Sequence, residues 1–197
     1  MLRNLLSRRR LLQTIPAALA ATGTIAALSD TPAQAATIPS IGAVSITRLW
    51  GTRAVRQKIV GTRRYRTVRV PRTKALYAGT DNPILDKGGL CHWPGTAALF
   101  NPGNCVLFGH RTSAGGPLRN SHRLRVGDQI VLTSAGTTLT YTVMLKPFVI
   151  ASNDVSSVVL WGDNSAPFLT LVSCSKANRL PTSKKYRLLV RAQALPA

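Results

Sequence analysis

The sequence contains no glutamate, and its six acidic residues, all aspartate, stand against 26 lysines and arginines. The formal net charge of +20 at pH 7 therefore predicts attraction to polyanions. An anionic cell envelope and nucleic acid would both satisfy this charge, so composition alone does not choose between them.

Cysteines are also few, and there are three of them: Cys91, Cys105 and Cys174. No two of them form a C-x-x-C pair, and their spacing fits no zinc motif, so no metal site is expected. The odd count leaves at least one thiol unpaired if the protein is exported. That thiol is a candidate for chemistry.

Long amphipathic helices are missing as well, and 15 glycines and 12 prolines are scattered along the chain. This composition favours a turn-rich β protein over a helical bundle. The expected strands are 105–108, 129–133, 138–150 with a break near Pro147, 167–173 and 186–192. The segment 167–173 is apolar on both faces, which is typical of a central buried strand. Short strands at this spacing predict an all-β barrel or sandwich, with one short helix near 155–161.

The first 35 residues have the pattern of an export signal. Residues 8–10 are three arginines, residues 11–28 are mildly apolar, and residues 33–35 form an A-x-A cleavage site. Residues 7–13 are similar to the twin-arginine export pattern. We therefore expect an extracellular or cell-envelope protein. Retention of the apolar stretch as a membrane anchor is the alternative.

A basic segment follows the export signal. Between Arg48 and Lys74 there are ten arginines or lysines and no acid. Apolar residues interleaved between Ile59 and Val70 predict extended structure, such as a basic hairpin. We expect residues 36–65 to be an N-terminal extension and residues 66–197 to be the catalytic domain. The basic segment is either a solvated charged surface or a docking site for an anionic wall polymer or nucleic acid.

Three residues combine into a candidate catalytic site. Cys174 follows the buried strand and precedes a basic loop, whose cations would favour the thiolate. His110 follows another apolar strand, and histidine is the usual partner that accepts and returns a thiol proton. Arg187 lies on the strand after the cysteine loop, where a fixed cation could stabilise an oxyanion. Each is a common structural residue when taken alone.

Several motifs occur in the order found in one known family. The segments are D-K-G-G-L-C-H-W-P-G-T-A at 86–97, G-N-C-V-L-F-G-H-R-T at 103–112, L-R-V-G-D-Q-I at 124–130, T-L-V-S-C at 170–174 and R-L-L-V at 187–190. Together they resemble sortases, most closely class E, over residues 66–193. Two positions depart from that pattern: Ser173 replaces Thr, and Trp93 stands where class E sortases carry Tyr.

The resemblance implies an eight-stranded β-barrel and an enzyme that cleaves a C-terminal sorting signal, L-P-x-T-G or L-A-x-T-G, through a thioester. It implies catalytic roles for His110, Cys174 and Arg187, and no metal or cofactor. The residues that would bind substrate are Trp93, Thr112, Val172 and Ser173. The implied partners are proteins with sorting signals and an amine acceptor from peptidoglycan or a pilin. Anionic wall polymers are a further candidate, and no nucleic-acid partner is expected.

Two other functions remain open at this point. A thiol peptidase would hydrolyse without amine transfer, although papain-like enzymes place the cysteine before the histidine and this chain has the reverse order. A secreted basic binding module would need only the charge and the barrel. Cys91 and Cys105 are additional to the family pattern, and they could form a disulfide outside the cell. His92 and His122 are expected to be solvated or structural.

Overall fold

The computed structural model describes residues 38–154, 156–159, 161–163, 165–175 and 184–194. All described residues belong to one compact unit, 37–197. The predicted export signal therefore lies outside the described residues. Within the described part of the chain, no helix is both long enough and apolar enough to cross a membrane.

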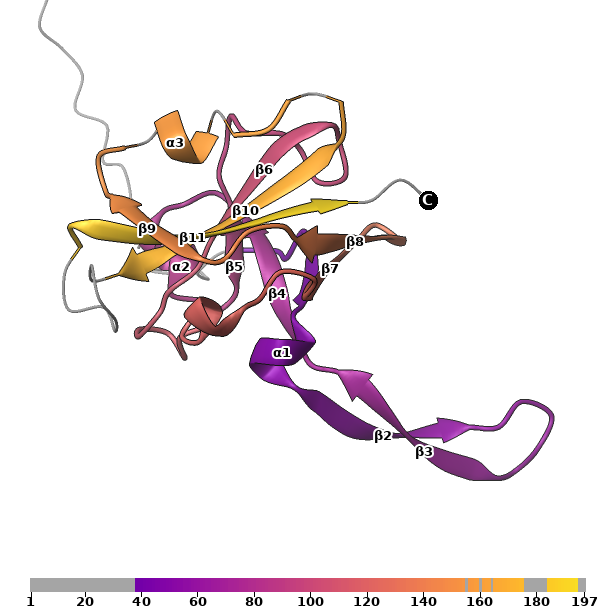
Figure 1. Cartoon of the computed structure of the whole chain (residues 1–197). Helices are drawn as coiled ribbons and strands as arrows, with labels where there is room; N and C mark the ends of the chain where they lie inside the picture. The colour runs from indigo at the N-terminus through magenta and orange to yellow at the C-terminus, as the bar shows by residue number, and fades with distance from the viewer. Residues whose placement is uncertain (1–37, 155, 160, 164, 176–183, 195–197) are drawn as a thin grey trace, which may run out of the picture. The chain divides into compact units, whose positions relative to one another are not determined.

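The structure is mostly β (Figure 1). Its strands are β1 (Gly42–Ser45), β2 (Thr52–Lys58), β3 (Tyr65–Pro71), β4 (Thr73–Ala78), β5 (Leu90–His92), β6 (Gly103–Phe108), β7 (Gln129–Ser134), β8 (Thr137–Val143), β9 (Phe148–Ala151), β10 (Pro167–Ser175) and β11 (Tyr186–Ala194). The helices are short: α1 (Thr47–Trp50), α2 (Asn82–Leu85), α3 (Ser156–Val159) and the 3-10 turn η1 (Ser121–Arg123).

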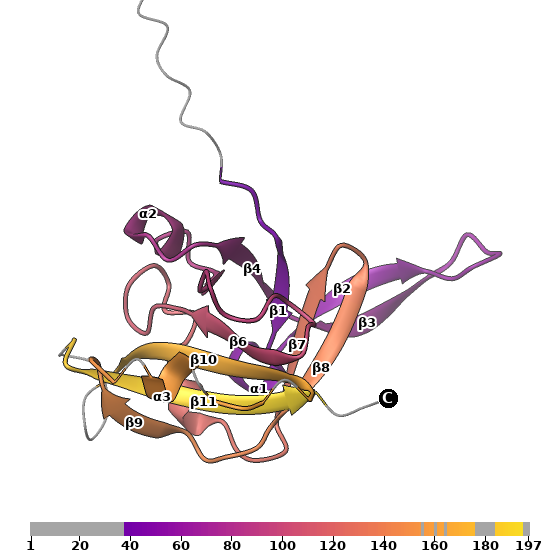
Figure 2. The same ribbon diagram turned by 90° about the horizontal axis from the view of Figure 1, so that it is seen from above.

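Eight of the strands close into a barrel. Neighbouring strands follow the order β10-β6-β5-β4-β1-β7-β8-β11, and pairing of β10 with β11 completes the ring. Strands β8 and β9 both pair with the same edge of β11. Strand β8 pairs with Ala192–Ala194, and β9 pairs with Tyr186–Leu189. Figures 1 and 2 show β10 and β11 side by side across the sheet. The predicted barrel and the break near Pro147 are both confirmed.

Two apolar clusters cover the two faces of the barrel wall. The barrel interior contains alternate residues of β6, β10 and β11, including Leu107, Leu171 and Val190. The intervening residues Val106, Val172 and Leu189 point outward. Helix α3 covers this outer cluster through Val158, with Trp93, Phe108, Phe148 and Ile150 beside it. Strand β10 is therefore buried on both faces, as its sequence predicted.

The predicted extension at 36–65 requires correction, because its first part belongs to the barrel. Strand β1 pairs with β4 on one side and β7 on the other. Val44 and Ile46 are fully buried in the core. The predicted basic hairpin is present and is formed by β2 and β3, which pair only with each other. Only the hairpin projects as an addition to the barrel (Figure 1).

All three cysteines are free thiols, so Cys91 and Cys105 do not form the disulfide that the sequence allowed. Both are fully buried. Burial disfavours the charged thiolate, and it raises the pKa of Cys91 to about 11 and that of Cys105 to about 12. Cys174 alone is partly exposed, so it is the thiol within reach of a substrate.

Candidate active site

Strand register brings the three predicted catalytic residues to one place. Strand β6 runs parallel to β10 with Phe108 beside Val172, and the Gly109 amide donates to the Val172 carbonyl at 3.1 Å. Cys174 lies two residues further along β10, and His110 follows the end of β6 by two residues, so the pairing brings His110 close to Cys174. On the other side of β10, the Cα atoms of Cys174 and Arg187 are direct antiparallel partners.

Cys174 and Arg187 also share a face of the sheet. Successive side chains of a strand point to opposite faces, so residues two apart lie on the same side. Cys174 is two residues beyond Val172 and Arg187 is two before Leu189, whereas His110 lies just past the end of β6 beyond Phe108. Phe108, Val172 and Leu189 all belong to the outer cluster. The candidate site therefore opens on the outside of the barrel, at the end of an apolar surface.

His110 is held by a partner that the sequence analysis missed. Its Nε2 atom lies 3.0 Å from Oδ1 of Asp86, at the C-terminal end of α2. A carboxylate accepts hydrogen bonds, so Nε2 carries a proton and Nδ1 is left as the ring's basic nitrogen in the neutral form. The only sequence signal for Asp86 was its place at the start of the 86–97 motif.

Arg111, the residue after His110, is a buried cation that reaches the end of β10. Only 2% of it is exposed. Its Nη1 donates to the Cys174 carbonyl at 3.4 Å and to Ser175 Oγ at 3.2 Å. Burial lowers the pKa of Arg111, and the negative charge of a Cys174 thiolate opposes that shift. Arg111 therefore combines structural support for the β10 end with positive charge close to the sulfur.

The second nitrogen of the Arg111 fork contacts His122, for which the sequence predicts a solvated or structural role. Arg111 Nη2 donates to His122 Nδ1 at 3.1 Å. Burial and the charges of Arg111 and Arg123 lower the pKa of His122, so the neutral ring accepts this bond. His92 is structural too, with Nε2 2.9 Å from the Ala97 carbonyl. Both contacts are structural, as the sequence allowed.

Arg187 is half-buried, and its Nη1 donates to the carbonyls of Lys184 at 2.7 Å and Tyr186 at 3.0 Å. These bonds direct the guanidinium along the end of β11. Lys184 is exposed in the same loop. Two other cations of that loop, Lys176 and Arg179, lie outside the described residues.

The four predicted substrate-binding residues are divided between surface and interior. Trp93 packs edge-on against Phe108 in the outer cluster, with ring centroids 4.9 Å apart. Thr112 is exposed in the loop after His110. Val172 lies beneath the outer surface and is only 1% exposed. Ser173 is buried and, by strand alternation, faces the interior, so it does not share a face with Cys174.

No metal site accompanies these residues in the part of the chain that the structure describes, where no group of three His, Cys, Asp or Glu side chains could hold an ion. The described side chains at the site are a thiol, an imidazole–carboxylate pair and two guanidinium groups. This set is suited to covalent acyl transfer.

Solved structures with the same fold include three sortases. Sortase A of Corynebacterium diphtheriae, a lid mutant, is 24% identical, with 84% of this chain and 75% of that chain covered and a TM-score of 0.62. SrtA of Actinomyces oris is 20% identical, with 80% of each chain covered and a TM-score of 0.63. Sortase E of Streptomyces avermitilis is 26% identical, with 80% of this chain and 88% of that chain covered and a TM-score of 0.58.

Comparison with family models gives a match to the Sortase domain over residues 68–195. No curated protein is similar enough to serve as a relative. The matched segment includes β4 to β11 and all three candidate catalytic residues. The matched segment covers more than half of the sequence. The solved sortase structures share the barrel, so both comparisons support the same family. The chain therefore belongs to the sortase family of cysteine transpeptidases.

Proposed function

We propose that this transpeptidase cleaves a C-terminal sorting signal of the L-A-x-T-G or L-P-x-T-G type between Thr and Gly, and joins the Thr carbonyl carbon to an amine. The observation that carries the proposal is the register of β6, β10 and β11. It pairs Cys174 with Arg187 and brings the end of β6, which precedes His110, alongside β10. A nucleophile, a proton carrier and a fixed cation are what acyl transfer through a thioester requires.

In the first half-reaction the Cys174 sulfur attacks the Thr carbonyl carbon, and the thiol proton goes to His110. The carbonyl oxygen becomes negative, and Arg187 stabilises it. When the C–N bond breaks, His110 returns the proton to the leaving Gly amine. A thioester between Cys174 and the Thr carbonyl remains.

In the second half-reaction an acceptor amine attacks the thioester and gives a proton to His110. The C–S bond breaks, the new amide is released, and His110 returns the proton to the Cys174 sulfur. Asp86 supports both halves, because a carboxylate near Nε2 holds the ring orientation and stabilises the imidazolium. Water in place of the amine would give hydrolysis instead.

The apolar outer surface is the proposed binding site for the signal peptide. Trp93 and Phe108 form its aromatic wall, and Ile150 and Phe148 of β9 extend it. An extended apolar Leu-Pro or Leu-Ala segment would bury its side chains against this wall. Thr112 is the proposed polar contact beside His110. Val172 and Ser173 would act from beneath, by fixing the end of β10.

The proposed setting is the cell envelope, with residues 1–35 as an export signal and an amine of peptidoglycan or a pilin lysine as the acceptor. The positive charge supports this setting, since envelope polymers and membranes are commonly anionic. Membership of a transpeptidase family removes the support for a binding module without chemistry.

The proposal is tested with the purified chain, a fluorogenic L-A-x-T-G or L-P-x-T-G peptide and an added amine. We expect cleavage, transfer of the peptide to the amine, and loss of both with Cys174→Ala. Cys91→Ala is the matched control, because it removes a buried thiol and should leave turnover intact.

Two results would contradict the proposal. Cleavage with no amine product at saturating amine would identify a peptidase. Full activity in the Cys174→Ala variant would show that another group is the nucleophile. Mass spectrometry of the acyl-enzyme with the attachment at Cys174 would support the thioester independently.

A further inference from the structure

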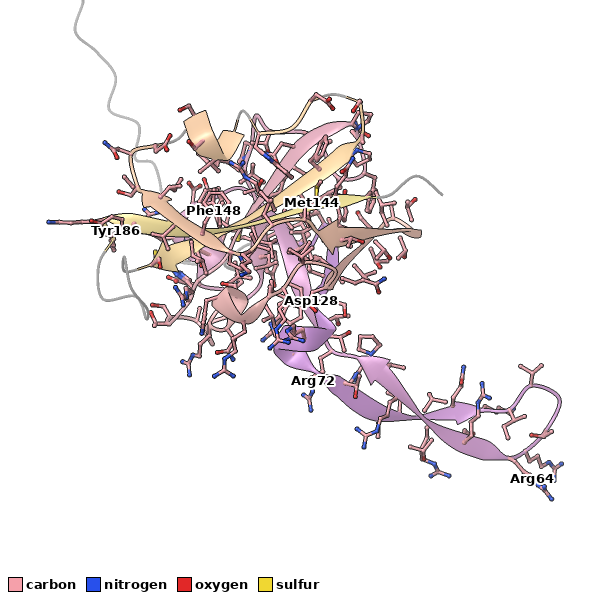
Figure 3. The ribbon with its side chains drawn as sticks, viewed as in Figure 1. Arg64, Arg72, Asp128, Met144, Phe148 and Tyr186 are labelled. Atoms are coloured by element: carbon pink, nitrogen blue, oxygen red, sulfur yellow. The ribbon has the colours of Figure 1, made fainter. Side chains whose placement is uncertain are left out.

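The basic hairpin, residues 52–71, is the largest feature that the proposed catalysis leaves unexplained. Seven consecutive pairs join its strands, from Thr52–Pro71 to Lys58–Tyr65. At a rise of about 3.4 Å per residue the paired part is about 20 Å long. The Sortase domain match begins at residue 68, so most of the hairpin precedes the family's shared core. In Figure 3, Arg72 lies where the hairpin joins the barrel and Arg64 lies at the far end.

The hairpin carries seven cations and no acid. All seven are exposed, and none forms a salt bridge with a residue in the described ranges. The pairing register divides the strand cations between the two faces of the ribbon. One face holds Arg56, Lys58 and Arg69, the other holds Arg53 and Arg66, and the turn adds Arg63 and Arg64. Positive charge therefore surrounds the hairpin rather than marking one side.

The tip of the hairpin adds exposed apolar side chains to the cations of the turn. Val60 is 97% exposed, Ile59 is 39% exposed and Tyr65 is 55% exposed. Such exposure of a large aliphatic side chain costs solvation free energy unless a partner covers it. Tyrosine, with an apolar ring and a polar hydroxyl, is enriched where membranes meet water. The tip thus presents apolar groups at the most distant point from the barrel core.

The tip is also a defined turn with two internal backbone hydrogen bonds. The Thr62 amide donates to the Ile59 carbonyl at 3.1 Å, and the Ile59 amide donates to the Arg64 carbonyl at 3.0 Å. Gly61 supplies the positive φ, +78°, that this turn needs after Val60. Satisfied backbone groups lower the cost of moving the tip into a medium with little water.

From these features we propose that the basic hairpin docks the enzyme tip-first on an anionic phospholipid surface. Val60 and Ile59 enter the boundary between headgroups and acyl chains, and the surrounding cations bind anionic headgroups. Apolar insertion combined with electrostatic attraction is the general mode of interfacial membrane binding. Cations on both ribbon faces suit an upright hairpin, which meets headgroups on every side.

An anionic polymer is the competing partner. A polymer binds by charge, and a groove or one face rich in cations serves it best. It gives no reason for a fully exposed valine at the end of the hairpin. The exposed apolar tip is therefore the observation that favours a bilayer.

The test measures binding of the full chain to vesicles of phosphatidylcholine with and without 30–40 mol% phosphatidylglycerol, roughly the anionic content that recruits basic segments. Arg63→Gln combined with Arg64→Gln should weaken binding to anionic vesicles about 25-fold, at about fivefold for each cation near the surface. Val60→Ser should weaken it about tenfold through loss of apolar insertion. Peptide cleavage in solution should not change in either variant, because both sites are remote from Cys174.

Matched controls separate the hairpin from general charge and hydrophobicity. Arg123→Gln combined with Arg125→Gln removes two exposed cations of the barrel, and Val126→Ser removes an apolar side chain that is 60% exposed. Both controls should bind vesicles like the parent chain. Equal effects of the hairpin and barrel variants would overturn the proposal.

A site-specific probe reports insertion independently of residues 1–37. Val60→Cys in a Cys174→Ala background leaves only the two fully buried native thiols, so an environment-sensitive fluorophore labels position 60. Its emission should shift to the blue on anionic vesicles, whereas a probe at Val126→Cys should not respond. No shift at position 60 would contradict insertion into a bilayer. If Val60→Ser left binding to vesicles unchanged, and binding to poly(glycerol phosphate) or DNA unchanged as well, an anionic polymer would replace the bilayer as the partner.

Discussion

Asp86→Asn offers a sharp test of the site, because it should separate activity from stability. Oδ1 of Asp86 lies 3.0 Å from Nε2 of His110. Asparagine has nearly the same shape, but it lacks the negative charge and can present an N–H group to the ring. The favoured Nε2–H tautomer and the stabilised imidazolium would both be lost.

The structure sets the expected magnitudes. The side chains of His110 and Asp86 are 24% and 63% exposed, and a polar contact this accessible contributes at most about 1 kcal/mol to stability. The Tm should therefore fall by less than about 4 °C. General acid–base catalysis contributes about 10²–10⁴-fold in total, of which ring orientation is one part. We expect kcat to fall about tenfold, which corresponds to about 1.4 kcal/mol, with little change in KM.

The assay compares kcat, KM and Tm for the parent chain, Asp86→Asn and Asp86→Glu, with Asp81→Asn as the control. Asp81 is an exposed aspartate at the other end of α2, and its side chain makes no capping bond there. Asp86→Glu should recover part of kcat, because the negative charge returns. If Asp86→Asn turns over like Asp81→Asn, or loses activity only through a large fall in Tm, Asp86 does not position His110.

The remaining predictions concern the guanidinium groups and the buried thiols. Arg187→Lys should lower kcat/KM about 100-fold with little change in Tm, because one ammonium cannot replace the fork of donors at an oxyanion; normal kinetics would remove Arg187 from the mechanism. Arg111→Lys should lower the Tm by about 4–8 °C, since one nitrogen cannot reach both the end of β10 and His122, and two lost bonds cost about 2 kcal/mol; an unchanged melting curve would contradict this. Cys91 and Cys105 have folded-state pKa values of about 11 and 12. Below the unfolded-state pKa near 9, each buried thiol contributes its full stabilisation of the folded state. Above pH 9, the free energy of unfolding measured by chemical denaturation should fall by about 1.4 kcal/mol per pH unit for each thiol. A double Cys→Ala variant with the same alkaline slope would show that other groups are responsible.

The sequence predicted the elements whose signal is local. The strands β6, β7, β10 and β11 are continuous apolar or alternating runs bounded by turn residues. It did not predict that β1 belongs to the barrel. Four residues, Gly42–Ser45, carry too little pattern to distinguish a strand from an extended linker. Their place depends on pairing with β4 and β7, about 30 and 90 residues away.

The candidate site likewise contains residues that the sequence predicted and residues that it did not. Cys174 and His110 were found because each ends a recognisable apolar strand, and Arg187 because its strand follows the cysteine loop. Asp86 and Arg111 were missed for opposite reasons. Asp86 is exposed, and its contact with His110 spans 24 residues of loop and strand. Arg111 is one of 26 cations, and only the folded chain distinguishes the buried one from the solvated ones.

The site faces outward because side chains alternate between the two faces along each strand. This alternation limits where a residue can be inserted. Cys174 and Arg187 face outward because each is an even number of residues from an outward apolar residue of its own strand, Val172 or Leu189. A one-residue insertion between Val172 and Cys174 would turn the sulfur toward the packed barrel interior, where no substrate can enter. Arg187 is under the same restriction, because its pairing with Cys174 depends on an unchanged spacing along β11. The spacing along β10 and β11 is therefore fixed by the outward position of the site.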